Sequence, residues 1–352
     1  MAFNTVALCL AKFSFLWYNN LIYNIILKEY TMINNINTAI DKILDMDPDP
    51  IPHFVLLKNF KGMTPNDPIY TSLYKQVCDH RFIKSFEETQ NERGFWPPFH
   101  GYTEGVVRKL LYFGLDKDHS CLKKVTDYLV KVLNNQEEWD LYEKQDNPLW
   151  FPNMFVPLVT AAVLSMIEKD HPSLEKPRQQ WVYIAKESFS DGHYDNKRNI
   201  DAIADCFGFS TKRPIAPFNY YSLILLAPGK NTSYLDETTD RALTDFCMKE
   251  AGALGYVYNN KPSDMIEISV QNRDSRDFWH WIRALSIISQ FHGWSSYKDK
   301  YCDWIMSQAN CDSLWEFPKK FDFSLSNSWR GKSKVIDSSV FVVRMLGGVW
   351  GF

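Results

Sequence analysis

The sequence predicts an all-α fold in which helical hairpins repeat along the chain. The chain has 352 residues, of which 45% are hydrophobic and 15% aromatic, so it can build a large packed core. Apolar residues recur at helical spacing, and no useful length of alternating strand pattern interrupts them. A loop rich in aromatic residues, Gly and Pro, an apolar helix, a short break and a second helix recur about every 45 to 60 residues. Because such hairpins cannot bury their faces alone, they must stack into an open solenoid or close into a ring. We expect an α/α toroid of inner and outer helices, because the first helix of each pair is apolar nearly all round.

Residues 1–31 are interpreted as an N-terminal extension that the fold can lose, or as an added helix. Lys12 and Lys28 interrupt its apolar runs, and none approaches the roughly 18 apolar residues of a membrane-spanning helix. The pattern of a signal peptide is also missing, whereas weak association with a membrane surface is the functional alternative. The seven scattered Cys form no C-x-x-C pair, which favours reduced thiols and a cytoplasmic protein.

Residues 32–90 are predicted to form N-terminal helices in the same domain as the repeats. A helix over residues 33–44 should end before Pro48 and Pro50, because proline cannot continue a helix. Further helices are expected over residues 54–60 and 69–86. The second of these follows the turn signal at Asn66-Asp67-Pro68.

Residues 91–352 are predicted to hold the repeats that close the toroid. The first helix of each pair is apolar nearly all round, as in a wall packed on both sides, and the second is amphipathic. The inner helices are expected over residues 102–113, 155–167, 218–227 and a segment ending at Phe291. The outer helices are expected over or around residues 121–133, 181–185, 238–248 and 301–306, and a half unit covers residues 335–346.

Charge and motifs exclude several classes of function. A net charge of -3 and a pI near 6.3 argue against a general nucleic-acid surface, which needs clustered Lys and Arg. The chain has no G-x-S-x-G, P-loop, G-x-G-x-x-G or H-E-x-x-H motif, so the common hydrolase, nucleotide-binding and metalloprotease interpretations have no support.

The stretch Arg273–Gln290 begins a helix with an acidic start, and it carries a resemblance. Ser275-Arg276-Asp277-Phe278-Trp279-His280 resembles the start of a late inner helix in protein farnesyltransferase β subunits, where the matching His binds zinc. Gly252-Ala253-Leu254 precedes it, similar to the G-G-L loop of that family. The repeats over residues 90–346 resemble those of prenyltransferase β subunits and squalene or hopene cyclases. Residues 45–60 resemble the start of bacterial proteins with these repeats.

The resemblance implies an interior that binds an isoprenoid or another long apolar ligand. If the protein is an enzyme, the resemblance implies a transferase or isomerase of the prenyltransferase or terpene-cyclase type. The zinc site of the family also needs a carboxylate and a thiolate near the imidazole. Pro217-Phe218-Asn219-Tyr220 offers no thiolate, and Asp245-Phe246-Cys247 falls on an expected outer helix. We therefore expect no cofactor and no metal, with zinc at His280 as the alternative.

The candidate site residues lie at or near the starts of the inner helices, which should meet at one rim if these helices run in the same direction. The candidate catalytic residues are Glu104, Asp277 and His280. The candidate ligand-binding residues are Trp96, Tyr102, Trp150, Asn153, Asn219, Tyr220, Arg276, Trp279 and Asp337. Positive helix ends at this rim favour an anionic group such as a diphosphate, which Arg276 and Lys197-Arg198 could hold.

Two other functions stay open at this point. Glycan-processing enzymes also use α/α toroids, with a carboxylate pair at the mouth, and Glu104, Asp191 and Asp277 could supply one. Alternatively, the chain is a non-catalytic helical-repeat scaffold whose interior is filled by side chains. The partner expected from the sequence is an apolar small molecule, and no partner subunit can be assigned.

Overall fold

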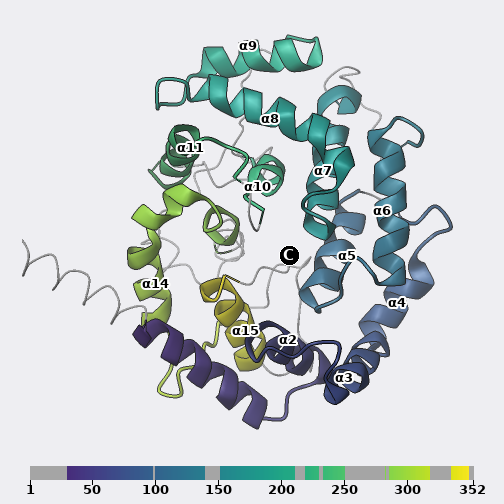
Figure 1. Cartoon of the computed structure of the whole chain (residues 1–352), viewed down its shortest axis with the longest axis vertical. Coiled ribbons are helices and arrows are strands. Elements are labelled where there is room, and N and C mark those ends of the chain that lie inside the picture. Colours follow the sequence, from purple (N-terminus) through teal and green to yellow (C-terminus); the bar gives the residue numbers. More distant parts are fainter. Residues whose placement is uncertain are drawn as a thin grey trace, which may run out of the picture.

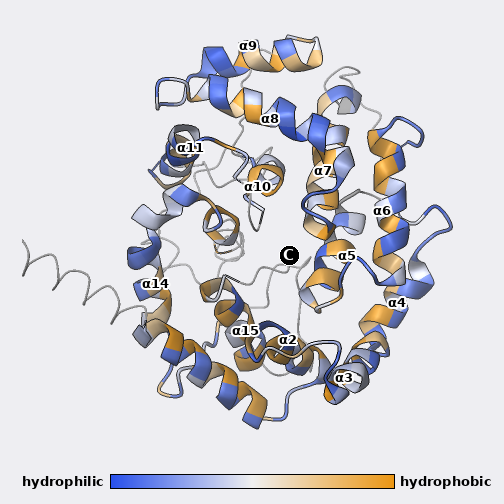
Figure 2. Ribbon diagram, in the orientation of Figure 1, coloured by the Kyte–Doolittle hydropathy of each residue, from blue (hydrophilic) through white to orange (hydrophobic). Residues whose placement is uncertain are grey.

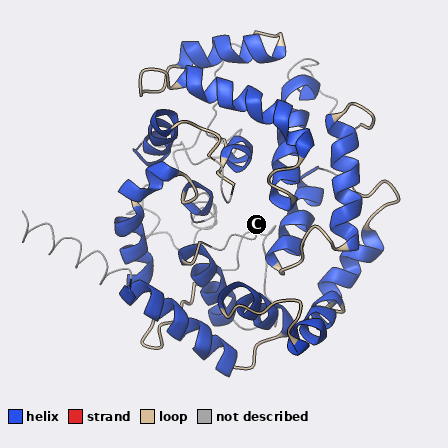
Figure 3. Cartoon of the chain, viewed as in Figure 1, coloured by secondary structure: helices blue, strands red, loops and turns tan. Residues whose placement is uncertain are grey.

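The computed structural model describes residues 30–97, 100–138, 151–210, 219–229, 233–249, 282, 285–317 and 334–348. Within these ranges every regular element is a helix, which confirms the all-α prediction (Figure 3). Among the described helices, none combines the length and the hydropathy needed to cross a membrane. Of the predicted extension over residues 1–31, only residues 30 and 31 are described, and both are helical.

The N-terminal helices differ from the prediction at their bounds. The first covers residues 30–45, so the helix is already formed before Met32. Next comes α2 (Pro50–Phe60), which begins at a proline because the first turn of a helix has no use for the missing N–H. The helix predicted over residues 69–86 is two helices, α3 (Pro68–Cys78) and α4 (Arg81–Thr89).

The predicted hairpins are present wherever both of their helices are described. The pairs are α5 (His100–Tyr112) with α6 (Ser120–Leu133), α7 (Val156–Ile167) with α8 (Glu175–Ser188), and α10 (Tyr220–Leu226) with α11 (Glu237–Lys249). Later come α14 (Lys298–Ser307) and α15 (Lys334–Leu346). Short helical turns precede three of these helices, namely η1 (Phe151–Phe155), η2 (Pro172–Leu174) and η3 (His292–Ser296).

One helix was not predicted. The stretch between Tyr194 and the start of α10 contains α9 (Asn196–Phe207), which begins at an Asp195 side chain that accepts hydrogen bonds from two backbone N–H groups. It packs against α8 on the side away from α10 (Figure 1). Only three residues of α9 are buried, so this helix is an outer addition that covers α8 of the second hairpin.

Burial separates the helices into two kinds. All seven residues of α10 are buried, and so is every residue of α7 from Leu158 to Ile167. Figure 1 shows α5, α7, α10 and α15 nearer to the centre than α4, α6, α8 and α14. Figure 2 shows that α6, α8 and α9 carry hydrophilic and hydrophobic residues together, as expected for amphipathic outer helices. The expectation of an apolar first helix therefore holds for α7 and α10.

Contacts at both ends show that the inner helices run in the same direction. At the N-terminal ends, the Tyr221 hydroxyl of α10 donates a hydrogen bond of 2.8 Å to Glu104 of α5. The Phe155 ring, just before α7, lies 6.2 Å from the Tyr221 ring. At the C-terminal ends, an Arg344 guanidinium N–H of α15 donates 2.6 Å to the Tyr112 carbonyl of α5.

Cationic side chains bind backbone carbonyls at the C-terminal ends of these helices. Such contacts are favourable because the last carbonyls of a helix have no partner within it and carry a partial negative charge. The contacts are Arg344 Nη1 to Tyr112 O, Lys58 Nζ to Gly114 O, Lys169 Nζ to Ile224 O and Arg178 Nη2 to Lys169 O.

The beginning and the end of the described chain lie against each other. Lys42 Nζ donates 2.8 Å to the Asp312 carbonyl and lies 3.4 Å from its carboxylate. Further along, α2 packs against α15. Gly347 lies close to the Phe60 ring, because a Cβ atom on residue 347 would be 2.5 Å from Phe60 Cε1.

Candidate functional site

Four buried polar residues of α5 and α10 meet at the N-terminal end of the inner helices. We call Glu104, Arg108, Tyr220 and Tyr221 the Glu104 network; their exposed fractions are 2%, 3%, 5% and 4%. Tyr221 OH donates to Glu104 Oε2 at 2.8 Å, and Arg108 Nη1 donates to Tyr220 OH at 2.6 Å. The same Arg108 Nη1 lies 3.4 Å from Glu104 Oε1.

Local sequence explains how this network forms. Glu104 and Arg108 are four residues apart in α5, so their side chains lie on the same face of the helix. On the other side, Asn219 begins α10, and its Oδ1 accepts hydrogen bonds from the backbone N–H groups of Tyr221 and Ser222 at 3.1 and 3.0 Å. This cap fixes the first turn of α10 and thereby places both tyrosines against α5. Asn219, which we predicted as a ligand-binding residue, thus has a demonstrable role in building the site.

One carboxylate oxygen of the network has no hydrogen-bond partner. Glu104 Oε1 is fully buried, and Arg108 Nη1 lies 3.4 Å from it in the ion pair. An unsatisfied buried polar atom costs about 1–3 kcal/mol, so it is rarely kept in an interior without a reason. This oxygen is therefore the best candidate for a group that a ligand would contact.

A second buried carboxyl group occupies the corresponding place on α15. Asp337 lies in the first turn of that helix and is 6% exposed. Asp337 also affects the Tyr112 hydroxyl of α5. Burial raises the pKa of this hydroxyl, and the positive charge of Arg344 opposes the shift. The negative charge of Asp337 raises the pKa further. Glu104 and Asp337 are thus both acidic residues near the starts of inner helices.

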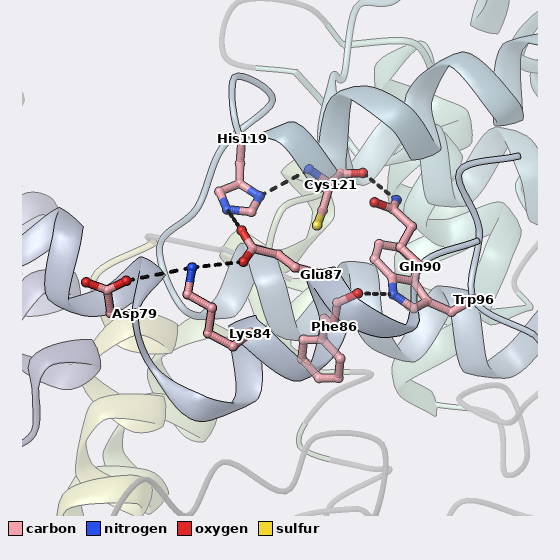
Figure 4. Close-up of polar contacts among 8 residues, drawn as sticks. All are labelled: Asp79, Lys84, Phe86, Glu87, Gln90, Trp96, His119 and Cys121. Atoms are coloured by element: carbon pink, nitrogen blue, oxygen red, sulfur yellow. Dashed lines mark hydrogen bonds and ion pairs between the residues drawn. The ribbon is translucent and has the colours of Figure 1, made fainter. Parts of the chain in front are cut away.

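Trp96, a predicted ligand-binding residue, has a structural role instead. It is fully buried, and its indole N–H donates 2.7 Å to the Phe86 carbonyl in the last turn of α4 (Figure 4). The Thr103 hydroxyl accepts from the Trp96 N–H at 3.1 Å and donates to the Trp96 carbonyl at 2.9 Å. Trp96 therefore joins an outer helix to the inner helix that follows it.

The same arrangement occurs at the other end of the chain. Trp315 donates its indole N–H to the Ile305 carbonyl of α14 at 2.8 Å. The Ser339 hydroxyl of α15 accepts from the Trp315 N–H and donates to its carbonyl. In both turns an Asn stands five residues before the Trp, and a residue with positive φ stands two before it, namely Gly94 (97°) and Ser313 (60°). The shared spacing N-x-x-x-x-W was a repeat signal that we missed in the sequence.

The other predicted site residues do not join the Glu104 network. Tyr102 is 40% exposed, and Asn153 is also exposed. Asp191 lies on the outside, where its carboxylate pairs with Arg198 of α9 at 2.8 Å. The cations Lys197 and Arg198 therefore lie on the outer helix α9, away from this interior rim. Trp150, Arg276, Asp277, Trp279 and His280 lie outside the described residues.

The described ranges hold no group of three or more His, Cys, Asp or Glu side chains that could bind a metal ion. Within α11, Asp245 accepts hydrogen bonds from Lys249 and from the Tyr297 hydroxyl. Cys247 is 3% exposed, and burial raises the pKa of its thiol. Asp245 thus makes hydrogen bonds within the protein, and Cys247 is part of the hydrophobic core.

A second polar cluster, the α4–α6 network, consists of Asp79, Lys84, Glu87 and His119 (Figure 4). Lys84 Nζ lies 3.7 Å from Asp79 and 3.1 Å from Glu87, whose other oxygen is 3.7 Å from His119 Nε2. The second ring nitrogen, His119 Nδ1, accepts from the Cys121 N–H at the start of α6. Burial lowers the pKa of His119, while the negative charges of Glu87 and Asp116 oppose this shift. The cluster connects α4 with α6, and its His119 caps the N-terminal end of α6.

Comparison with known proteins finds no matching family model, no matching curated protein and no matching solved structure. The function must therefore be inferred from the residues of this chain.

Proposed function

We propose that the protein is an α/α toroid that binds an isoprenoid or another long apolar ligand in its interior. The observation that carries this proposal is the buried Glu104 Oε1, which lies on an inner helix without a hydrogen-bond partner. Support for the toroid comes from inner helices that run in the same direction and from the contact of Lys42 with Asp312 across the ends of the described chain.

The composition of the inner helices supports an apolar ligand. Their buried residues are mainly aliphatic and aromatic, as in α7 and α10. Transfer of a polyene chain from water into such surroundings contributes roughly 0.8 kcal/mol per CH2 group. The Glu104 network would then contact the polar end of the ligand, because it is a charged group on an inner wall.

The same residues would suit a cyclase-type reaction that is started by proton transfer. Glu104 would donate or accept a proton. The faces of Tyr220 and Tyr221 would stabilise positive charge that develops on a hydrocarbon chain. Asp277 and His280, which the sequence places at the start of a late inner helix, remain candidates for the same rim.

The alternatives receive less support. A glycan-active site needs two carboxylates on either side of a sugar bond, and Asp191, one of the three candidates, lies in an outer ion pair. A plugged scaffold has no use for a buried carboxylate with an unsatisfied oxygen, because an apolar side chain of similar size would be at least as stable.

The test is photo-crosslinking of the full chain with a farnesol analogue that carries a diazirine. We expect one adduct per chain, on peptides from residues 100–112 and 220–226, and its loss when unlabelled farnesol competes. Binding should also strengthen from geraniol to farnesol to geranylgeraniol, because each added CH2 group is buried. Labelling confined to the exposed surface of α9, or no competition, would contradict the proposal. Release of reducing sugar from a polysaccharide panel would favour the glycan alternative.

A further inference from the structure

The proposed binding site has a polar end whose chemistry the Glu104 network restricts. We infer that the ligand carries a hydrogen-bond donor at this end, a hydroxyl or an ammonium group, and not a phosphate or a carboxylate. This inference rests on the proposed function and specifies its ligand class.

The two carboxylate oxygens of Glu104 differ in their surroundings. A carboxylate only accepts hydrogen bonds. Oε2 already accepts from the Tyr221 hydroxyl, whereas Oε1 is buried, has no hydrogen-bond partner and lies 3.4 Å from Arg108 Nη1 in the ion pair. A ligand that satisfies Oε1 must therefore present an O–H or N–H group, and a ligand oxygen without hydrogen would add an unfavourable contact.

The basic side chains near the inner helices are already engaged in contacts within the protein. Arg108, the cation of the network, directs Nη1 to the Tyr220 hydroxyl at 2.6 Å and forms the ion pair with Glu104. Its charge is thus balanced within the network. Lys58, Lys169 and Arg344 each bind a backbone carbonyl at the opposite, C-terminal ends of the inner helices.

The N-terminal ends of the inner helices carry acidic side chains nearby. The starts of helices attract anions, and on that ground the sequence favoured a diphosphate. In the structure, Glu104 lies in the second turn of α5 and Asp337 in the first turn of α15, and both side chains are buried. Their negative charges offset the positive helix ends and would repel a further anion. The Tyr220 ring already has the Arg108 guanidinium 5.6 Å from its centroid, and the Tyr221 ring would favour an ammonium group in the same way.

The experiment compares three ligands with the same hydrocarbon chain by calorimetric titration of the full chain: farnesol, farnesylamine and farnesyl phosphate. We expect farnesol and farnesylamine to bind with a Kd at least about tenfold lower than that of farnesyl phosphate. In Glu104→Gln, the amide oxygen can still accept a hydrogen bond. We therefore expect the Kd of farnesol to change less than about threefold and the Kd of farnesylamine to rise about tenfold or more.

Two controls keep the result specific. Glu168→Gln changes a surface ion pair with Lys117 and should leave all three Kd values unchanged. Tyr221→Phe alters the surroundings of Oε2 and not those of Oε1, so the order of the three ligands should persist. The inference is overturned if farnesyl phosphate binds as tightly as farnesol, or if Glu104→Gln weakens farnesylamine no more than farnesol; the proposed function then still stands. If none of the three ligands binds, the proposed function fails and the inference fails with it.

Discussion

The Tyr221 hydroxyl is the contact through which α10 holds the carboxylate of α5. Replacement by Phe removes the donor to Glu104 Oε2, so that both carboxylate oxygens are buried without a hydrogen bond. We expect Tyr221→Phe to lower the free energy of unfolding by about 1–3 kcal/mol in urea titrations. The matched control is Tyr183→Phe, which removes an exposed bond to Asp205 and should cost less than about 0.5 kcal/mol. Equal effects of the two changes would contradict a special role of Tyr221.

Lys169 gives the stability a dependence on pH. Burial lowers the pKa of its amine to about 7, the positive charge of Arg178 adds to this shift, and Asp170 opposes it. In the unfolded chain the amine has a pKa near 10.4. Between these two values the unfolded state binds more protons, so the contribution of Lys169 to stability increases as the pH rises, by up to about 1.4 kcal/mol per pH unit.

The measurement is the free energy of unfolding at pH 7 and at pH 9.5, for the natural chain and for Lys169→Met. Other groups titrate in this interval, so the comparison uses the difference between the two proteins. We expect the free energy of unfolding of the natural chain to increase relative to that of Lys169→Met as the pH rises. A difference that stays constant would show that Lys169 keeps its proton in the folded state, held by the Ile224 carbonyl.

At the scale of elements, three helical segments begin with the dipeptide Asp-His. Nδ1 of His80, His119 and His171 accepts a hydrogen bond from the backbone N–H two residues later, at 3.4, 3.3 and 3.2 Å. A protonated Nδ1 cannot accept this bond. Burial lowers the pKa of both His80 and His119, so the folded state binds fewer protons than the unfolded state. Their contribution to stability is therefore present above pH 6.5 and is lost as the pH falls through the folded pKa values.

We expect the melting temperature to fall between pH 7.5 and pH 5, and to fall less in His119→Asn. Asparagine can cap a helix without titrating near neutral pH. At pH 5 the free energy of unfolding of His119→Asn should exceed that of the natural chain by about 1 kcal/mol, measured by urea unfolding. His53→Asn serves as the control because His53 starts no helix, lying inside α2. The same acid sensitivity in His119→Asn and the natural chain would exclude this cap as a cause.

The elements also show where sequence patterns succeed. Hairpin helices were predicted because apolar residues recur at helical spacing, which burial on α7 and α10 explains. The break between α3 and α4 was missed because His80 is not among the preferred capping residues. For α9, the reason is different: it buries only three residues, so its apolar pattern is weak.

The candidate site was harder to predict than the helices. Glu104 was found from its position near the start of an inner helix. Tyr220 and Tyr221 lie more than a hundred residues away from α5 in sequence, and their hydrogen bonds to Arg108 and Glu104 form only because α10 and α5 both pack against α7. Arg108 was not predicted, although its spacing of four residues from Glu104 on one helix was a usable signal.

At the scale of the whole molecule, the N-terminal helix is part of the core. Within residues 30–45, Ile40 and Ile43 are fully buried, and Lys42 contacts Asp312. We expect a chain that begins at Met32 to keep a cooperative thermal transition, as the sequence analysis proposed. A chain that begins at Asp47 should lose several kcal/mol of stability, because it lacks these core side chains. Calorimetry of both truncated chains checks this, and a loss of the transition in the longer one would show that residues before Met32 are needed.

The contacts between residues 30–60 and residues 312–347 bear on how the molecule opens. In a linear array of repeats each terminal unit touches one neighbour and frays independently. Here Lys42 donates a hydrogen bond to Asp312, and Phe60 packs against Gly347, so the two ends of the described chain contact each other. Amide protons of Ile40 and Val343 should therefore exchange with solvent in the same opening event, although three hundred residues separate them along the chain.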